Sequence, residues 1–259
     1  MNGEKYFYEN PLEGKCVNRW EWHLCPCCPP MFFKILSELP SYIYSYDDND
    51  LFVNQYIGSS ADVLINNNWV KVSQVSEMPW KGNILITITP VSQTRFNLKL
   101  RVPGYVRRTE NPGELYTSMD TASGDLEILL NGKKIDGSIV DGYFNINHFW
   151  KPGDKVQIRF PLPVRTIKSN SLVEENKEKV AFMIGPILYC FESIDNQKLD
   201  EAILEPGFEP TLSGKMVGMD NATTISVNSN LGELKGIPFY LQNNKPNVQL
   251  RCELMYFVV

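Results

Sequence analysis

The sequence predicts an all-β protein made of two β-sandwich, jelly-roll-like modules that follow a short helical segment. From residue 41 onward, apolar and polar side chains alternate in short runs. Glycine, proline and asparagine separate these runs at close intervals, a pattern typical of sandwiches and jelly rolls. Before residue 41, a single stretch has the spacing of an amphipathic helix. With 259 residues, 43% of them hydrophobic, the chain can bury cores of this size.

The helix is expected within residues 31–39. Apolar residues at positions 32, 35, 36 and 39 follow the i, i+3, i+4, i+7 spacing of one helix face. Pro29 and Pro30 stand where a first helical turn tolerates proline, and Pro40 ends the pattern. Residues 1–40 therefore form a lead-in segment, and an exposed apolar face on this helix would favour a homo-oligomer.

Residues 41–166 are expected to form the first sandwich. Residues 42–46 and 51–57 flank the turn Asp47-Asp48-Asn49-Asp50, which predicts a hairpin. This turn lacks the glycine and the distal glutamate of an EF-hand, so a turn is favoured over a calcium loop. Further strands are expected at residues 61–65, 69–75, 83–89, 96–102, 126–130, 142–146 and 155–160.

Residues 167–259 are expected to form the second sandwich. The strand pattern weakens over the polar residues 168–179 and recovers afterwards. Strands are expected at residues 180–191, 223–227, 236–241 and 248–259.

Charge and hydropathy argue against two classes of partner. The net charge is −5 and the charges are scattered, so no basic stripe is available for nucleic acid. The apolar runs are far shorter than the roughly 20 residues that span a bilayer, so no membrane partner is expected. The first residues lack the apolar core of a signal peptide. The compartment stays open, with a bacterial cytoplasm or periplasm compatible with the sequence.

Half of the six cysteines lie within four positions, in Cys25-Pro26-Cys27-Cys28. They are too close together to form disulfides with one another without strain, which favours metal binding or reactive thiol chemistry. They also precede the predicted helix, whose free N–H groups and dipole favour a thiolate. By contrast, Cys190, in an apolar run, and Cys252, in Leu250-Arg251-Cys252, are expected to be buried hydrophobic residues.

Four further side chains are weaker candidates. His23 could bind a metal or act as a base, although a histidine beside a tryptophan is more often packed or hydrogen-bonded. His148 is expected to be structural. Glu13 and Glu21 could act as an acid or a ligand, but they are more simply solvated side chains.

Several ordered motifs resemble glycoside hydrolase family 127, the β-L-arabinofuranosidases. The element that carries most of this resemblance is Cys25-Pro26-Cys27-Cys28-Pro29-Pro30, preceded by Arg19-Trp20-Glu21-Trp22-His23 and by Tyr8-Glu9-Asn10-Pro11-Leu12-Glu13. Further matches along the chain are Tyr42-Ile43-Tyr44, Tyr56-Ile57-Gly58, Leu100-Arg101-Val102-Pro103-Gly104-Tyr105, Asp141-Gly142-Tyr143, Trp150-Lys151-Pro152-Gly153-Asp154, Pro161-Leu162-Pro163-Val164-Arg165 and Gly185-Pro186-Ile187-Leu188-Tyr189.

The resemblance implies a retaining exo-glycosidase with a cysteine nucleophile bound to zinc. Cys27 would be the nucleophile and a zinc ligand, and Cys28 a second ligand. Cys25 and His23 would lie beside the ligands without binding the metal. A zinc-bound sulfur stays a thiolate near neutral pH and can attack an anomeric carbon, as a carboxylate does in most retaining enzymes. The substrate would be an arabinose-containing carbohydrate.

The chain departs from the family pattern in two places. The family takes its other zinc ligands from a Glu-x-Cys element upstream of the paired cysteines, and no such element precedes Cys25. Met31 stands where the family usually has asparagine. The family places its active site in an (α/α)6 barrel followed by two β-sandwiches. Residues 1–40 would then be the end of that barrel, and the chain the C-terminal portion of a family member, inactive alone.

Two other functions remain open. The chain could be a non-catalytic β module for carbohydrate binding or domain association, with Trp69, Trp80, Tyr105 and Trp150 as sugar-stacking candidates. Each of them lies within or beside an apolar strand pattern, which favours core packing or strand-edge filling over sugar stacking. Alternatively, the three thiols could form a structural or trafficking metal site that is completed across a dimer.

Overall fold

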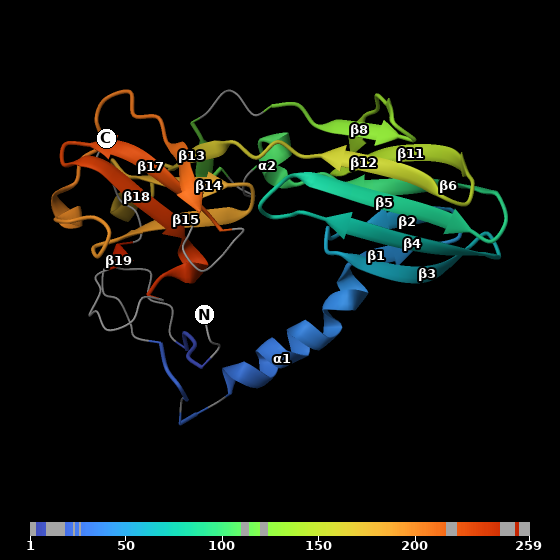
Figure 1. The fold of residues 1–259 in the computed structure, drawn as a ribbon, viewed down its shortest axis with the longest axis horizontal. Coiled ribbons are helices and arrows are strands. Elements are labelled where there is room, and N and C mark those ends of the chain that lie inside the picture. Colours follow the sequence, from blue (N-terminus) through green and yellow to red (C-terminus); the bar gives the residue numbers. More distant parts are fainter. Residues whose placement is uncertain are drawn as a thin grey trace. The chain divides into compact units, whose positions relative to one another are not determined.

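The structure is a computed structural model that describes residues 4–8, 19–22, 24–25, 27–109, 114–119, 124–215, 222–243 and 252–253. It divides into two compact units, each of which is described by itself. The sandwich unit comprises Pro29–Thr109 and Ser123–Leu162, and the half-barrel unit comprises Met1–Cys28, Glu110–Ala122 and Pro163–Val259. The predicted all-β fold behind a short helix is confirmed (Figure 1).

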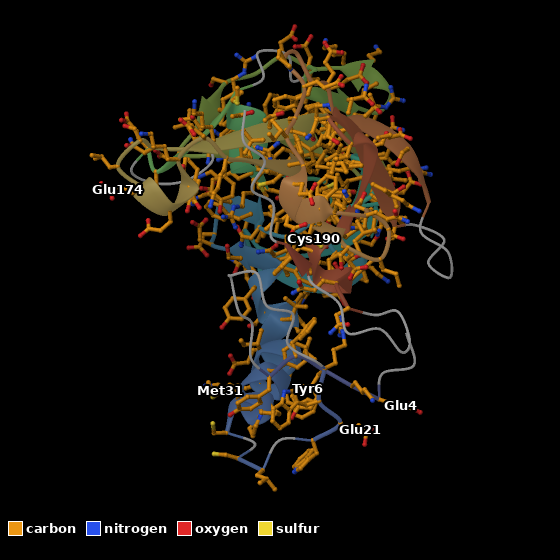
Figure 2. The ribbon with its side chains drawn as sticks, turned by 90° about the vertical axis from the view of Figure 1, so that its left-hand side faces the viewer. Glu4, Tyr6, Glu21, Met31, Glu174 and Cys190 are labelled. Carbon is orange, nitrogen blue, oxygen red and sulfur yellow. The ribbon has the colours of Figure 1, made fainter. Side chains whose placement is uncertain are left out.

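Helix α1 spans Cys28–Glu38, and the 3₁₀ helix η1, Leu39–Tyr42, follows it. The helix begins three residues before the predicted start because the first turn accommodates Pro29 and Pro30, whose missing N–H groups would have no helical partner there. None of its residues is buried. Met31, labelled in Figure 2, is 56% exposed and Phe33 is 66% exposed, so the apolar face of α1 is open to solvent among the described residues.

Two sheets face each other in the sandwich unit. Every strand pairing in them is antiparallel except that of β2 with β6. The first sheet runs in the order β1 (Tyr44–Tyr46), β2 (Asp50–Val53), β6 (Thr94–Arg101), β11 (Tyr143–Trp150) and β10 (Ile139–Val140). The second runs in the order β3 (Ser59–Ile65), β4 (Asn68–Ser76), β5 (Asn83–Pro90), β12 (Asp154–Arg159), β8 (Glu127–Leu130) and β9 (Lys133–Lys134). The short helix α2, Gly104–Arg107, follows β6.

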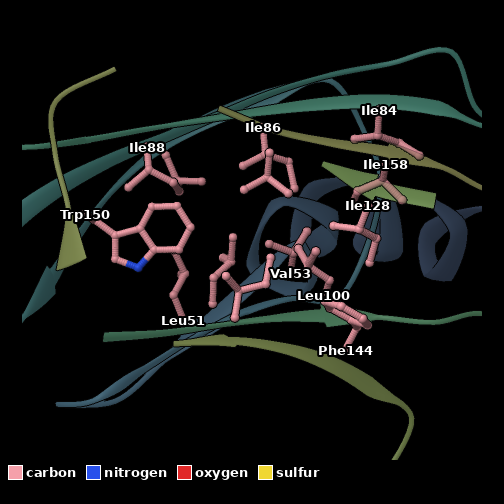
Figure 3. Packing of buried hydrophobic residues seen from close by; sticks show 14 of the residues in the cluster. Leu51, Val53, Ile84, Ile86, Ile88, Leu100, Ile128, Phe144, Trp150 and Ile158 are labelled. Atoms are coloured by element: carbon pink, nitrogen blue, oxygen red, sulfur yellow. The ribbon is translucent and has the colours of Figure 1, made fainter. Parts of the chain in front are cut away.

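The core of the sandwich unit lies between these two sheets (Figure 3). Alternate residues point inward, as the period-two pattern predicts; in β5 these are Ile84, Ile86 and Ile88. Trp150 is fully buried and donates its indole N–H to the carbonyl of Phe96 at 3.1 Å. The indole therefore packs as a hydrophobic group while its one polar atom is satisfied.

The half-barrel unit is built on one continuous sheet that curls into a half-barrel. Its strands run in the order β16 (Thr211–Lys215), β17 (Thr223–Ser229), β18 (Gly232–Pro238), β15 (Ile187–Glu192), β14 (Val180–Ile184), β13 (Val164–Ser169) and β7 (Tyr116–Ser118), and β19 (Cys252–Glu253) pairs with β15. Three 3₁₀ turns accompany them: η2 (Glu174–Asn176), η3 (Leu199–Glu201) and η4 (Phe239–Leu241).

Two features of this sheet differ from the sequence pattern. Residues 180–191 read as one strand but form a hairpin, because Gly185 adopts φ +52° and Pro186 follows it at the turn. Strand β7 falls between segments of the sandwich unit in the sequence, yet it pairs with β13. No alternating pattern marks β7 as a strand, since it is three residues long.

Among the described residues, no helix is long and apolar enough to cross a membrane.

Candidate functional site

A short pair of segments precedes the cysteines in the half-barrel unit. Tyr6 and Trp20 form an antiparallel bridge, with backbone N–H to carbonyl distances of 2.9 and 2.8 Å. Beside it, Lys5 and Glu21 form an exposed ion pair at 3.3 Å. We call residues 4–8 and 19–22 the N-terminal pair; Figure 2 labels Glu4, Tyr6 and Glu21 in it. The bridge joins the chain just before Tyr8 to the chain just before the cysteines.

Tyr8 and the cysteines form one hydrogen-bonded group. The Tyr8 hydroxyl donates to the carbonyl of Cys25 at 2.9 Å and lies 3.1 Å from the Cys27 Sγ. The Cys28 Sγ lies 3.6 Å from the same hydroxyl and 3.8 Å from the Cys27 Sγ. The backbone supports the turn, since the Cys27 N–H donates to the Cys25 carbonyl at 2.9 Å. All three cysteines are exposed.

This group favours a thiolate at Cys27. The hydrogen bond from Tyr8 is the main cause that lowers the pKa of the Cys27 thiol, and contacts with the Cys28 and Cys25 thiols add to it. The same contacts with Cys27 and Cys28 raise the pKa of Tyr8, so that the phenol keeps its proton. A protonated phenol beside a thiolate is the arrangement in which Tyr8 donates and sulfur accepts.

The spacing of two sulfur atoms fits zinc. Zinc binds thiolate sulfur at about 2.3 Å with tetrahedral geometry, which places two sulfur ligands about 3.8 Å apart. The Cys27 and Cys28 Sγ atoms have that separation, 3.8 Å. Across the described ranges, however, no three His, Cys, Asp or Glu side chains are arranged to hold a metal ion. The described part of the chain thus offers two of the four ligands of a tetrahedral site.

The structure brings together only some of the residues that the sequence singles out. Cys25, Cys27 and Cys28 gather, whereas His23, Glu13 and Cys16 lie outside the described residues. Glu21 pairs with Lys5. Tyr8 was missed as a site residue: it stands in a quoted motif, but nothing local in the sequence shows that it returns to a cysteine 19 positions away.

Most of the other candidates pack or form hydrogen bonds within the fold. Trp150 is fully buried and Tyr105 is 9% exposed, so neither is available to stack on a sugar, and the favoured expectation of core packing is confirmed for both. Trp80 is half-buried, and Trp69 is 55% exposed. His148 contacts Asp154, with Nε2 3.3 Å from Oδ2. Asp47 accepts the N–H groups of Asn49 and Asp50 at 2.9 and 2.8 Å, which is the expected turn.

Cys190 is fully buried on β15 in the half-barrel unit, as the sequence predicts (Figure 2). The Cys252 side chain lies outside the described residues.

Comparisons with known proteins match both units. The profile described as the middle domain of glycoside hydrolase family 127, β-L-arabinofuranosidase, matches residues 50–162. The profile described as the C-terminal domain of the same family matches residues 164–252. A curated non-reducing end β-L-arabinofuranosidase from Bifidobacterium longum subsp. longum is 29% identical over 217 residues, which cover 76% of this chain and 30% of the relative.

Solved structures agree with these matches. A GH127 β-arabinofuranosidase has a TM-score of 0.90 and 28% identity, covering 99% of this chain and 42% of its own. A GH127 β-L-arabinofuranosidase from Geobacillus stearothermophilus T6 has a TM-score of 0.81 and 27% identity, again covering 99% and 42%. The chain therefore spans less than half the length of the relatives that it matches.

Proposed function

This chain belongs to glycoside hydrolase family 127 and corresponds to the C-terminal portion of a family member, and from that premise we propose that it contributes the nucleophile to a zinc-dependent, retaining β-L-arabinofuranosidase. The observation that carries the proposal is the 3.8 Å separation of the Cys27 and Cys28 sulfur atoms, the spacing of two thiolate ligands on one zinc ion.

Cys27 would be the nucleophile. Zinc, when bound, would hold the Cys27 sulfur as a thiolate near neutral pH. In the first step, a sulfur–carbon bond forms at the anomeric carbon while the glycosidic carbon–oxygen bond breaks, and a carboxylic acid protonates the departing oxygen. In the second step, a water molecule attacks the same carbon as the sulfur–carbon bond breaks, and it gives its proton to the carboxylate left by the first step. The thiolate is restored and the configuration of the sugar is retained.

Tyr8 and Cys28 would hold the nucleophile in place. The Tyr8 oxygen lies 3.1 Å from the attacking sulfur and 2.9 Å from the Cys25 carbonyl oxygen, so its one proton is shared between these two acceptors. Cys28 would be the second zinc ligand of this chain. We expect the remaining ligands and the acid from the part of the enzyme that the matched relatives have outside the region covered by this chain.

The exposed apolar face of α1 agrees with an active site that is completed by another part of the enzyme. Phe32 and Leu36 are 59% and 49% exposed although they stand on the apolar face of an amphipathic helix. Exposed apolar surface of this kind marks an interface. The occupant proposed for it is the remainder of a family 127 enzyme.

The test is a chimera in which residues 1–259 replace the corresponding region of the Geobacillus relative. We expect hydrolysis of an aryl β-L-arabinofuranoside, with about one zinc ion per chain by elemental analysis. Cys27→Ser should lower kcat on the order of 10³-fold or more. Cys28→Ser should lower the zinc content, because a site that loses a thiolate loses affinity. Cys190→Ala, which removes a thiol of the half-barrel core, is the matched control and should keep both zinc and activity.

A Cys27→Ser chimera that hydrolyses the substrate at the parent rate would overturn the nucleophile assignment. Full zinc content in a Cys27→Ser, Cys28→Ser double variant would overturn the metal assignment.

A further inference from the structure

Arg19 joins the N-terminal pair to the half-barrel. Its Nη2 donates to the carbonyl of Tyr240 at 3.2 Å and to that of Gln242 at 3.1 Å. Both carbonyls lie at the end of η4, more than 200 positions further along the chain. On the other side, the guanidinium carbon lies 4.2 Å from the centroid of the Phe7 ring. Arg19 is thus held between an aromatic ring and two backbone acceptors.

A buried carboxylate completes this environment. Glu192, on β15, is 1% exposed, and its Oε1 accepts the backbone N–H of Asn243 at 2.5 Å. Burial lowers the pKa of Arg19, and the negative charge of Glu192 acts in the opposite direction. A charge that is this deeply buried is stable only beside an opposite charge or strong donors. The charge of Glu192 therefore favours the charged form of Arg19.

The contacts of Arg19 continue to the nucleophile through neighbouring residues. Arg19 precedes Trp20, whose backbone is bridged to Tyr6. The Tyr6 ring contacts the Tyr8 ring edge-on, with 6.5 Å between centroids. The Tyr8 hydroxyl then reaches the Cys27 sulfur at 3.1 Å. Neighbouring residues from Arg19 to Cys27 are thus in direct contact, and the residues at the half-barrel end of this set are the most buried.

We infer that Arg19 is a positioning residue: it fixes the N-terminal pair on the half-barrel, and through Tyr6 and Tyr8 it sets the place of the Cys27 sulfur. The C-terminal domain would accordingly serve the reaction by holding the nucleophile segment. The catalytic consequence rests on the proposed function, whereas the anchoring itself does not.

The guanidinium is suited to this task in a way that lysine is not. One terminal nitrogen of Arg19 donates to two carbonyls while the flat group lies over Phe7. A lysine ammonium keeps the charge beside Glu192 but loses the planar stacking and the rigid fork. Arg19→Lys should therefore rescue part of what Arg19→Met removes.

The first test measures anchoring without metal or substrate. Hydrogen exchange is followed at the bridge amides of Tyr6 and Trp20 in the full 259-residue chain. Loss of a charge-assisted contact in Arg19→Met should speed exchange about tenfold or more, because such bonds contribute about 1.5–3 kcal/mol. Glu192→Gln, nearly isosteric, removes the negative charge that favours the charged form of Arg19 and should speed exchange in the same direction. Lys5→Met, which removes the exposed pair of the same segment, is the control and should change exchange less than about twofold.

The second test asks whether anchoring reaches the sulfur. Cobalt(II) is titrated into the metal-free chimera, which holds the remaining ligands, and the sulfur-to-cobalt absorption band reports the Cys27–Cys28 pair. Arg19→Met should weaken cobalt binding about tenfold, and Arg19→Lys should restore part of it. In the active chimera, Arg19→Met should lower kcat about tenfold while KM changes less than about twofold, since the sugar is not contacted.

The outcomes separate the two proposals. Unchanged exchange at Tyr6 and Trp20 in both Arg19→Met and Glu192→Gln overturns the anchoring. Faster exchange with unchanged cobalt affinity and kcat overturns the positioning role and leaves Arg19 a structural residue. A parent chimera with no cobalt–thiolate band counts against the proposed zinc site instead, and exchange in the 259-residue chain still decides the anchoring.

Discussion

The sandwich unit and the half-barrel unit differ in what holds their key residues: packing in a buried core in the first, and a few hydrogen bonds near the surface in the second. The sandwich unit closes two sheets over a core in which Leu51, Ile86 and Trp150 are fully buried. The half-barrel unit contains buried residues too, but Cys25, Cys27 and Cys28 are exposed and depend on a few polar contacts through Tyr8 and Arg19. Stability in the first unit is spread over many side chains, whereas the site in the second rests on single hydrogen bonds. The two properties should therefore respond separately to mutation.

The largest expected effect is Trp150→Ala in the sandwich unit. Removing a fully buried indole leaves a cavity and takes away its hydrogen bond to the Phe96 carbonyl, so the free energy of unfolding should fall by about 3–5 kcal/mol. Urea denaturation followed by circular dichroism measures it. Phe149→Ala, next to it on β11 but 50% exposed, is the control and should cost less than about 1 kcal/mol. A cost below about 1 kcal/mol for Trp150→Ala would contradict the account of this core.

A smaller effect is expected for Gly236→Ala in the half-barrel unit. An added Cβ would lie 2.7 Å from Cγ1 of Ile225 and 3.0 Å from Cζ of Phe191. This overpacking should lower the free energy of unfolding by about 1–3 kcal/mol. Gly58→Ala is the matched control, because the nearest atom to its Cβ, the Gln74 carbonyl oxygen, is 3.9 Å away. Equal stability of the two alanine variants would show that the curled sheet packs more loosely than described.

The smallest of these effects concerns Asp154. Its Oδ2 accepts the Lys151 N–H at 2.8 Å and its Oδ1 accepts the Asn131 amide at 2.9 Å. Burial by itself would raise the pKa of Asp154. These donors and His148 outweigh burial, so the pKa lies below its ordinary value. Asp154→Asn should cost about 1–2 kcal/mol at pH 7.

The lowered pKa of Asp154 sets the direction in which its contribution to the free energy of unfolding changes with pH. A depressed carboxyl pKa stabilises the fold above the ordinary value of about 4, and this contribution is lost as the pH falls through the folded-state pKa. The difference between Asp154→Asn and the parent, measured by urea denaturation, should therefore shrink below about pH 4. A constant difference from pH 7 to pH 3 would argue against it. Arg159→Ala, which breaks the exposed pair with Glu127, should cost less than about 0.5 kcal/mol at pH 7 and serves as the control.

Local patterns were sufficient for much of the fold. The helix before the sheets, the hairpin at Asp47 and the inward positions of β5 follow from the spacing of residues that are near in sequence. The hairpin at Gly185 was missed because a continuous apolar run hid a turn that depends on one left-handed residue. Strand β7 was missed because three residues carry no period, and its partner β13 lies almost fifty positions away.

The sequence by itself determined the all-β class, the family and the clustering of Cys25, Cys27 and Cys28, because alternation, motif order and close spacing are properties of neighbouring residues. Only the tertiary structure decided that Tyr8 meets Cys27, that Arg19 docks on carbonyls of η4, and that Trp150 fills a core. These are contacts between distant parts of the chain. Their geometry is set by how sheets curl and close, and no local spacing records it.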